Sequence, residues 1–249
     1  MAIKVDEKQK IFSISTVNTT YMMGVLQGGH LLHLYYGKLL EDMNAKYLLR
    51  HGETEDALYW RKKDEEFFFL TAAFEYPVWG TGDFRDVCLC VRDENGCRGC
   101  RLQYDSYRIL SSKPSLPGLP ATFGDNGETL EITLKDACIG LTAVLRYSVF
   151  ADSDAIIKSV ELRNEGSGKL YLEKALSSSL TLDNEGYELS TLHGSWGRER
   201  HIVTRAVTEG KHIVASVCGK TSHQQQPFMM LTSPGATQNW GCVYGVNFV

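Results

Sequence analysis

The sequence predicts an all-β protein, a large antiparallel two-sheet β-supersandwich that forms a single domain over residues 1–249. Many short segments, such as residues 11–15 and 128–135, alternate apolar and polar side chains, which is typical of half-buried strands. Turn signals such as residues 28–29 and 164–168 separate these segments at short spacing. Since no stretch shows a capped 3.6-residue apolar period, we expect two antiparallel sheets rather than helices.

Composition indicates an ordinary globular protein. Of 249 residues, 43% are hydrophobic and 22% are charged, which fits one large all-β domain. The net charge is −4, and the sequence has no basic stripe of the kind that nucleic-acid binding requires. No apolar run approaches the roughly 20 residues of a membrane helix, so we expect neither nucleic acid nor a membrane as partner. Residues 1–10 lack the apolar core of a secretory signal, which predicts a cytoplasmic location.

The first strands are predicted from alternation and turn residues. Gly28 and Gly29 favour a hairpin turn. His33 shares a face with Leu31 and Tyr35, and is interpreted as a sheet histidine because no second metal ligand stands at a matching offset. The predicted strands in this part are residues 11–15, 20–26, 31–37, 67–70, and a hairpin of 87–91 with 97–100 about an Asn95-Gly96 turn.

The later strands are longer. Prolines at every third position, Pro114, Pro117 and Pro120, predict a stiff connector before them. The strands predicted beyond it are residues 128–135, 139–150, 155–163, 169–182, 187–192, 202–208, 212–217, 228–231 and 242–249.

Two loops are candidates for function. Residues 41–66 are rich in charge and carry Tyr59 and Trp60, and loops longer than about 12–15 residues are usually functional or disordered. This segment is either a solvated loop or an arm anchored by one of those aromatics. In the loop 75–86, Asp83 and Arg85 stand two apart and can pair with loop backbone or with each other.

Seven cysteines lack the spacing of a secreted disulfide framework, so reduced thiols are expected. Cys97 and Cys100 have a zinc-like gap, but they fall on opposite faces of an extended strand, whereas Cys88 and Cys90 share one face. Because convergence on one ion would distort the hairpin, we expect buried or unreactive thiols, with no metal and no cofactor.

A polar stretch begins at residue 194. Trp196, Arg198, Glu199, Arg200 and His201 offer more hydrogen-bonding capacity than a connecting loop needs. One interpretation is a polar staple that holds a long loop onto a sheet. The other is direct contact with a sugar or a protein partner. A second polar motif, residues 222–228, includes His223 and Gln225.

Several of these motifs occur in the order of a known family. The matching pieces are residues 33–38, 75–77 with 82–85, 118–122, 128–134, 196–200 and 222–228. With them the chain resembles the N-terminal β-supersandwich domain of glycoside hydrolase family 36, the microbial α-galactosidases, a fold of the galactose-mutarotase-like type. The resemblance spans almost the whole chain.

The resemblance implies a retaining α-galactosidase that removes terminal α-linked galactose from melibiose- and raffinose-type sugars. Such a mechanism needs two carboxyl groups about 5–5.5 Å apart. In the family both lie on a (β/α)₈ barrel that follows the sandwich, and no aspartate here matches either catalytic motif. We therefore expect the barrel to be absent and this chain alone to be inactive. The implied partners are that barrel, α-galactoside oligosaccharides and further copies in a homo-oligomer, a tetramer in related enzymes.

The resemblance also points to the long N-terminal loop. In some tetrameric members an acidic and a basic residue of this loop contact sugar in a neighbouring subunit. Counting back without gaps from Glu75 places Glu53 at the acidic position and Glu65, a charge reversal, at the basic one. A gapped alignment brings Arg61 into place, and Asp56 and Trp60 are alternatives to Glu53.

Two functions without hydrolysis compete with the enzyme fragment. A free-standing carbohydrate-binding sandwich would stack Trp60, Trp79 or Trp196 on a sugar ring. An oligomerisation module would instead use an exposed apolar face for association.

Overall fold

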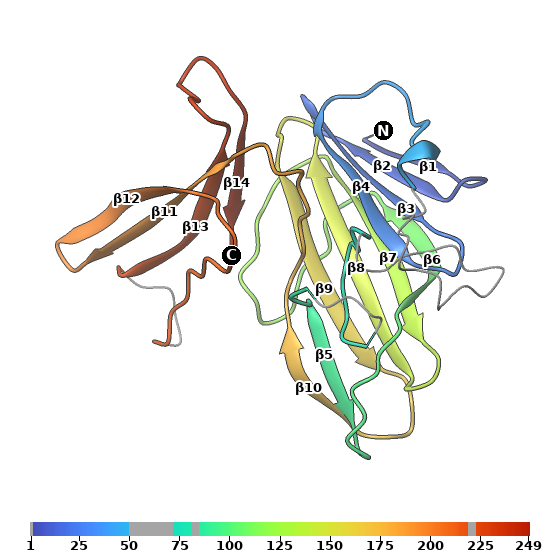
Figure 1. The fold of residues 1–249 in the computed structure, drawn as a ribbon. Helices are drawn as coiled ribbons and strands as arrows, with labels where there is room; N and C mark the ends of the chain where they lie inside the picture. The colour runs from blue at the N-terminus through green and yellow to red at the C-terminus, as the bar shows by residue number, and fades with distance from the viewer. Residues whose placement is uncertain (1, 50–71, 81–84, 219–222) are drawn as a thin grey trace, which may run out of the picture. The chain divides into compact units, whose positions relative to one another are not determined.

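The computed structural model describes residues 2–49, 72–80, 85–218 and 223–249, and antiparallel strands dominate these ranges (Figure 1). The first sheet is a meander of consecutive strands in the order β1-β2-β3-β4. A short 3₁₀ turn, η1 (Lys46–Leu48), follows it. The strands are β1 (Ile3–Asp6), β2 (Ile11–Ser15), β3 (Thr19–Val25) and β4 (Leu31–Lys38).

A second meander has the order β6-β7-β8-β9, with strands β6 (Gln103–Leu110), β7 (Gly127–Asp136), β8 (Leu141–Phe150) and β9 (Ile156–Asn164). Every residue of β8 is buried, because this strand is central and covered on both faces. A short ladder joins β5 (Leu89–Asp93) to β10 (Leu170–Ala175).

A third four-stranded sheet has the order β12-β11-β13-β14. Its strands are β11 (Glu188–Ser195), β12 (Arg198–Ala206), β13 (Gln225–Thr232) and β14 (Val243–Asn247).

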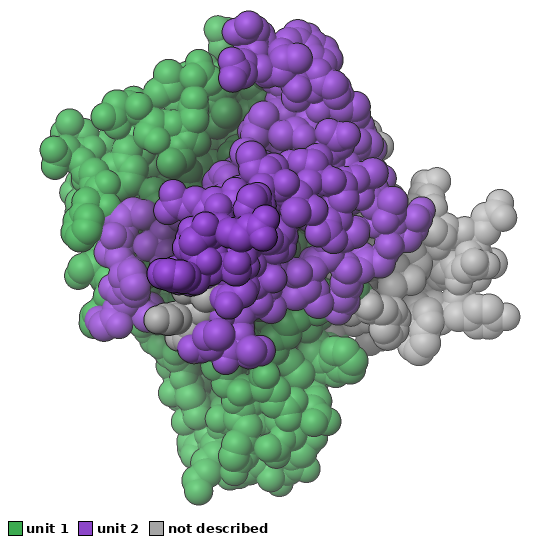
Figure 2. All heavy atoms as spheres, turned by 90° about the vertical axis from the view of Figure 1, so that its left-hand side faces the viewer, with its two compact units in different colours: residues 1–117, 123–181 green, residues 118–122, 182–249 purple. Residues whose placement is uncertain are grey.

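The chain divides into two compact units (Figure 2). Unit 1 comprises residues 1–117 and 123–181, and unit 2 comprises residues 118–122 and 182–249. In unit 1 the two meanders share one hydrophobic core, to which β2 contributes Phe12, β7 contributes Leu130 and β8 contributes Leu145. Full burial of such a side chain contributes about 1.5–3 kcal/mol, so this core supplies the main stabilisation of unit 1.

The predicted all-β antiparallel class is confirmed, and most predicted strands are present within a few residues of their expected ends. The expected hairpin partner of residues 87–91 is wrong, because β5 pairs with β10 rather than with residues 97–100. The Asn95-Gly96 turn itself forms, since the Asp93 carboxylate accepts hydrogen bonds from the amides of Asn95 and Cys97.

Other strand boundaries differ from expectation. Residues 212–217 form no strand, and the strand expected over 169–182 ends at Ala175. Strands β1 and β6 were not predicted. β6 is half exposed, and its tyrosines at positions 104 and 107 stand three residues apart, so it shows no regular apolar alternation although it pairs with β7. The predicted strand 67–70 lies outside the described residues. In the part of the chain that the structure describes, no helix is long and apolar enough to cross a membrane.

Candidate functional site

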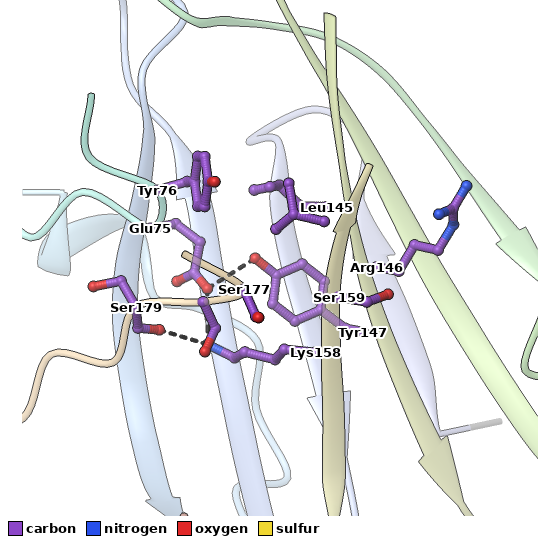
Figure 3. Close-up of a pocket in the computed structure, with 11 residues that line it drawn as sticks. Glu75, Tyr76, Leu145, Arg146, Tyr147, Lys158, Ser159, Ser177 and Ser179 are labelled. Carbon is purple, nitrogen blue, oxygen red and sulfur yellow. Dashed lines mark hydrogen bonds and ion pairs between the residues drawn. The ribbon is translucent and has the colours of Figure 1, made fainter. Parts of the chain in front are cut away.

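The most unusual polar site in unit 1 surrounds Glu75, whose side chain is only 1% exposed (Figure 3). The backbone positions it there. The Glu75 amide donates to the Leu31 carbonyl, and the preceding Phe74 forms an isolated bridge with Leu32. Residues 74–75 therefore add briefly to the edge at β4, and the carboxylate turns inward.

Two tyrosines and a lysine surround the carboxylate. The Tyr21 hydroxyl lies 2.7 Å from both oxygens of Glu75, and the Tyr147 hydroxyl donates to Oε1 at 2.8 Å. Lys158 Nζ lies 3.0 Å from Oε1 and also donates to the Tyr21 hydroxyl at 2.7 Å. His33 Nδ1 is 3.5 Å from Oε2. The charge of Glu75 is thus compensated and hydrogen-bonded, as a buried charge requires.

The pKa values follow from this environment. Burial alone would raise the pKa of Glu75, but the Lys158 charge, the nearby His33 ring and the hydrogen bond from Tyr21 outweigh it and lower the pKa to about 2. Burial, and then the negative charge of Glu75, raise the pKa of Tyr21 and of Tyr147 well above the ordinary value. The carboxylate is therefore ionised and both phenols are protonated across the physiological pH range.

The cluster also fixes a segment of chain that follows β10. Lys158 Nζ donates to the Ser179 carbonyl at 2.9 Å, and the Tyr76 hydroxyl donates to the Leu176 carbonyl at 2.9 Å. The thiol of Cys88 lies 3.6 Å from the Ser178 carbonyl oxygen. A shallow depression opens beside Lys158, and residues 177–179 line it (Figure 3). The Glu75 cluster therefore holds this segment against unit 1.

This geometry does not suit glycoside hydrolysis. Among the described residues that line the depression, Glu75 carries the only carboxylate, whereas a retaining mechanism needs two. Its oxygens are occupied by Tyr21, Tyr147 and Lys158. The arrangement is that of a structural ion pair which organises the interior of unit 1.

A second polar network crosses the sheet β6-β7-β8-β9. The register places Arg108 opposite Glu131, and Glu131 opposite Arg146. Both arginines contact the Glu131 carboxylate, and Arg146 also contacts Glu161, which in turn contacts Arg163. These alternating charges form a ladder on the sheet face opposite Leu130 and Leu145, because side chains alternate between faces along each strand.

The predicted polar stretch lies at the β11–β12 hairpin of unit 2. The Trp196 side chain is 85% exposed, and Arg198, Glu199 and Arg200 are exposed with it. The Glu199 carboxylate accepts from the Gly197 amide at 2.8 Å and lies 3.7 Å from His223 Nδ1. The structure therefore brings the two polar motifs together through this pair, while the choice between staple and direct contact stays open.

The side-chain alternation of a regular strand breaks within this stretch. Arg200 has a φ of +61°, and the register between β11 and β12 shifts between His193 and Ser195. A bulge of this kind re-aims the side chains beside it, so Arg198 and Arg200 do not follow a regular strand. Gln225 pairs with His193, and its side-chain oxygen is buried without a hydrogen-bond partner among the described atoms.

The remaining predicted site residues fall in other places. Arg85 donates to the Ala72 carbonyl, a backbone group that precedes the loop 75–86. The other candidates, Glu53, Asp56, Trp60, Arg61 and Asp83, lie outside the described residues.

The cysteines form no metal cluster in the described part of the chain. Cys88 and Cys100 are buried, and burial raises the pKa of their thiols to about 11 and about 12. Cys90 is half-buried and Cys97 is exposed.

Sequence reasoning did not single out Lys158, Tyr147 or Glu131. Glu131 falls at a polar position of a regular alternation and gave no detectable signal. A detectable signal existed for Lys158, because it interrupts an apolar row of Ile156, Val160 and Leu162 on one face of its strand. A charged residue at such a position is buried only when it is paired. Its partner, however, comes from a distant segment and leaves no local trace.

The chain is similar to known proteins over its whole length. Residues 29–249 match the Glycosyl hydrolase family 36 N-terminal domain. The chain is 35% identical over its whole length to the alpha-galactosidase AgaA of Geobacillus stearothermophilus, and this match covers 35% of AgaA. A bifunctional alpha-galactosidase/sucrose kinase, AgaSK of Mediterraneibacter gnavus, is 34% identical over the whole chain, which covers 27% of that protein.

Solved structures of alpha-galactosidases share the fold of this chain. The alpha-galactosidase from Lactobacillus brevis superposes with a TM-score of 0.92 at 34% identity, covering 98% of this chain and 33% of that one. An AgaA variant in complex with raffinose has a TM-score of 0.89 at 36% identity, covering 95% of this chain and 33% of that one. The chain thus spans about a third of the length of these α-galactosidases.

Proposed function

Because the chain belongs to the family of glycosyl hydrolase family 36 N-terminal domains, we propose that it is the non-catalytic N-terminal part of a retaining α-galactosidase. In that enzyme it shapes the active site and makes subunit contacts, and a catalytic barrel carries both reacting carboxyl groups. The substrates are oligosaccharides with terminal α-linked galactose, of the raffinose and melibiose type. The enzyme works in the cytoplasm as a homo-oligomer.

One observation carries this proposal: the chain matches α-galactosidases over its full length but spans only about a third of theirs. The chemistry of the Glu75 cluster supports it. A single buried carboxylate that is held ionised by Lys158 cannot act as both nucleophile and acid/base.

Hydrolysis of an aryl α-galactoside tests the proposal. The purified 249-residue chain should release no product above the buffer background. A hybrid in which this chain replaces the matching third of AgaA should hydrolyse raffinose. Turnover by the chain alone, lost on changing one of its own carboxylates, would contradict the proposal.

The long N-terminal loop has a role in this proposal that rests on the family resemblance. We propose that Glu53 or Asp56, with Trp60 and Arg61, reaches sugar bound in a neighbouring subunit. Glu53→Gln in the hybrid should raise KM for raffinose with little change in kcat. A fall in kcat without any change in KM would argue against a binding role.

A second candidate is a free-standing carbohydrate-binding module. The exposure of Trp79 and Trp196 favours it, since exposed aromatic faces stack on sugar rings. Titration calorimetry of the 249-residue chain with galactose and raffinose separates the two. Saturable heat that is lost in Trp196→Ala would favour the binding module, and no heat would favour the enzyme part.

A further inference from the structure

Unit 2 lacks a hydrophobic core of its own among the described residues. The described part of the chain contains three clusters of packed, buried apolar side chains, and all three consist of residues of unit 1. In residues 182–249, Tyr187 and Leu189 are the buried hydrophobic residues of the described part, at 7% and 8% exposure. A sheet needs at least one face packed against another layer to be stable.

The strand register divides the side chains of this sheet between two faces. Ile202 pairs with Leu192, and Ser190, two residues before Leu192, pairs with Met230. Because side chains alternate along a strand, these residues share a face. We call it the Ile202 face, and its apolar members are Leu192, Ile202, Phe228, Met230 and Val243. A hydrogen bond of 2.7 Å between the hydroxyls of Ser190 and Thr204 confirms the assignment.

The opposite side, the Val203 face, carries the large buried residues. Val203 pairs with Thr191, and Leu189 lies on the same face two residues earlier. The ring of Tyr187 contacts that of Tyr244 edge-on, with centroids 6.0 Å apart. Tyr187, Leu189 and Thr191 are all buried. This face is therefore already packed at its centre.

The Ile202 face is not packed in this way. Ile202 is 67% exposed and Val243 is 54% exposed, while Leu192, Phe228 and Met230 are half-buried. Apolar side chains therefore lie on all four strands of this face, and two of them are more than half exposed, which is typical of an interaction surface. Burial of these side chains would recover roughly 25 cal/mol per Å² of apolar surface.

The chemistry of the Ile202 face indicates a protein partner rather than a sugar. On the regularly paired part of this face Glu188 is the charged residue, the hydroxyl residues Ser190, Thr204 and Thr232 stand among the apolar side chains, and no Trp or Tyr is present. Sugars are recognised by rigid aromatic faces with polar groups around them. Aliphatic, Met and Phe side chains without surrounding rigid polar groups instead suit an obligate interface that resembles a domain core.

From this, and resting on the proposed function, we infer that the Ile202 face of the β12-β11-β13-β14 sheet docks onto the portion of the α-galactosidase that this chain does not span. Two thirds of each related enzyme lies outside the match. That portion is large enough to cover the face within one polypeptide.

Two matched substitutions in two proteins test the inference. Ile202→Lys and Val203→Lys alter neighbouring residues of β12 that point to opposite faces. Each is made in the 249-residue chain and in the AgaA hybrid, and melting temperature and raffinose hydrolysis are measured. Ile202→Lys should leave the melting temperature of the chain unchanged but lower that of the hybrid by about 4 °C or more, with loss of hydrolysis. Val203→Lys should leave the hybrid no more affected than the chain.

Each outcome decides a separate point. Equal destabilisation of chain and hybrid by Ile202→Lys, or no effect on either, would overturn the docking surface while the proposed function stands. Failure of the unsubstituted hybrid to hydrolyse raffinose would instead count against the proposed function. Light scattering shows whether the 249-residue chain dimerises. If Ile202→Lys abolishes such a dimer but leaves the hybrid unchanged, the occupant is a second copy and the inference is wrong.

Discussion

Lys158 Nζ lies 3.0 Å from Glu75 Oε1, and this ion pair joins residues 83 positions apart inside unit 1. The pair connects the loop after β4 to β9. It also extends to the Ser179 carbonyl, so one ammonium group joins three separate segments of the chain. Because the carboxylate is fully buried, its loss or the loss of its partner has a large expected effect.

Removal of one partner should destabilise unit 1 strongly. Lys158→Met leaves the Glu75 charge buried without its cation, and we expect a loss of about 3–5 kcal/mol of unfolding free energy. Urea denaturation followed by tryptophan fluorescence measures it. The double variant Glu75→Gln with Lys158→Met should recover part of this loss, since no unpaired charge remains. A double variant as unstable as the sum of the two singles would argue against direct coupling.

The same pair predicts an acid dependence with a defined sign. The folded-state pKa of Glu75 is about 2, below the ordinary value for an unfolded chain. Its contribution to the free energy of unfolding is therefore complete above about pH 4.5. The contribution declines as pH falls toward 2 and amounts to about 3 kcal/mol when complete. The stability difference between wild type and Glu75→Gln should therefore shrink between pH 4.5 and pH 2. A constant difference over that range would show that Glu75 is not ionised in the folded protein.

The charge ladder on β6-β7-β8-β9 should behave unlike a surface ion pair. Arg146→Met leaves the buried Glu131 with Arg108 alone, and we expect a cost of about 3 kcal/mol or more. Asp105→Asn, which removes the exposed Lys135–Asp105 contact of 3.3 Å, is the matched control and should cost less than about 1 kcal/mol. Equal effects in urea titrations would mean that the ladder is solvated.

The β11–β12 hairpin should tolerate a side chain at Gly197 better than at Gly194. A Cβ added at Gly194 would lie 2.1 Å from the Arg198 carbonyl oxygen, whereas one at Gly197 meets nothing within 4 Å. Gly197→Ala should cost about 1 kcal/mol, because its φ of +74° is strained for alanine. Gly194→Ala should cost distinctly more. Hydrogen exchange of the β11 and β12 amides measures both, and greater protection in Gly194→Ala than in Gly197→Ala would contradict this ranking.

Part of the functional site was predictable and part was not. The polar motifs at residues 196–200 and 222–228 were recognisable as sequence patterns, whereas the 3.7 Å contact between Glu199 and His223 came only from the structure. The Glu75 cluster was not predictable in the same way. Its members come from β3, β8, β9 and the loop after β4. Apart from Lys158, which interrupts an apolar row of β9, each is an ordinary residue in its own segment.

By itself, the sequence determined the all-β class and most strand positions. Side-chain alternation and turn residues are local properties that survive without knowledge of the rest of the chain. The ordered motifs likewise sufficed to identify the family. Only the tertiary structure decided that β5 pairs with β10, that Lys158 neutralises Glu75, and that the Ile202 face stays open. These are contacts between distant segments, and their energy depends on burial and register that arise only when the sheets assemble.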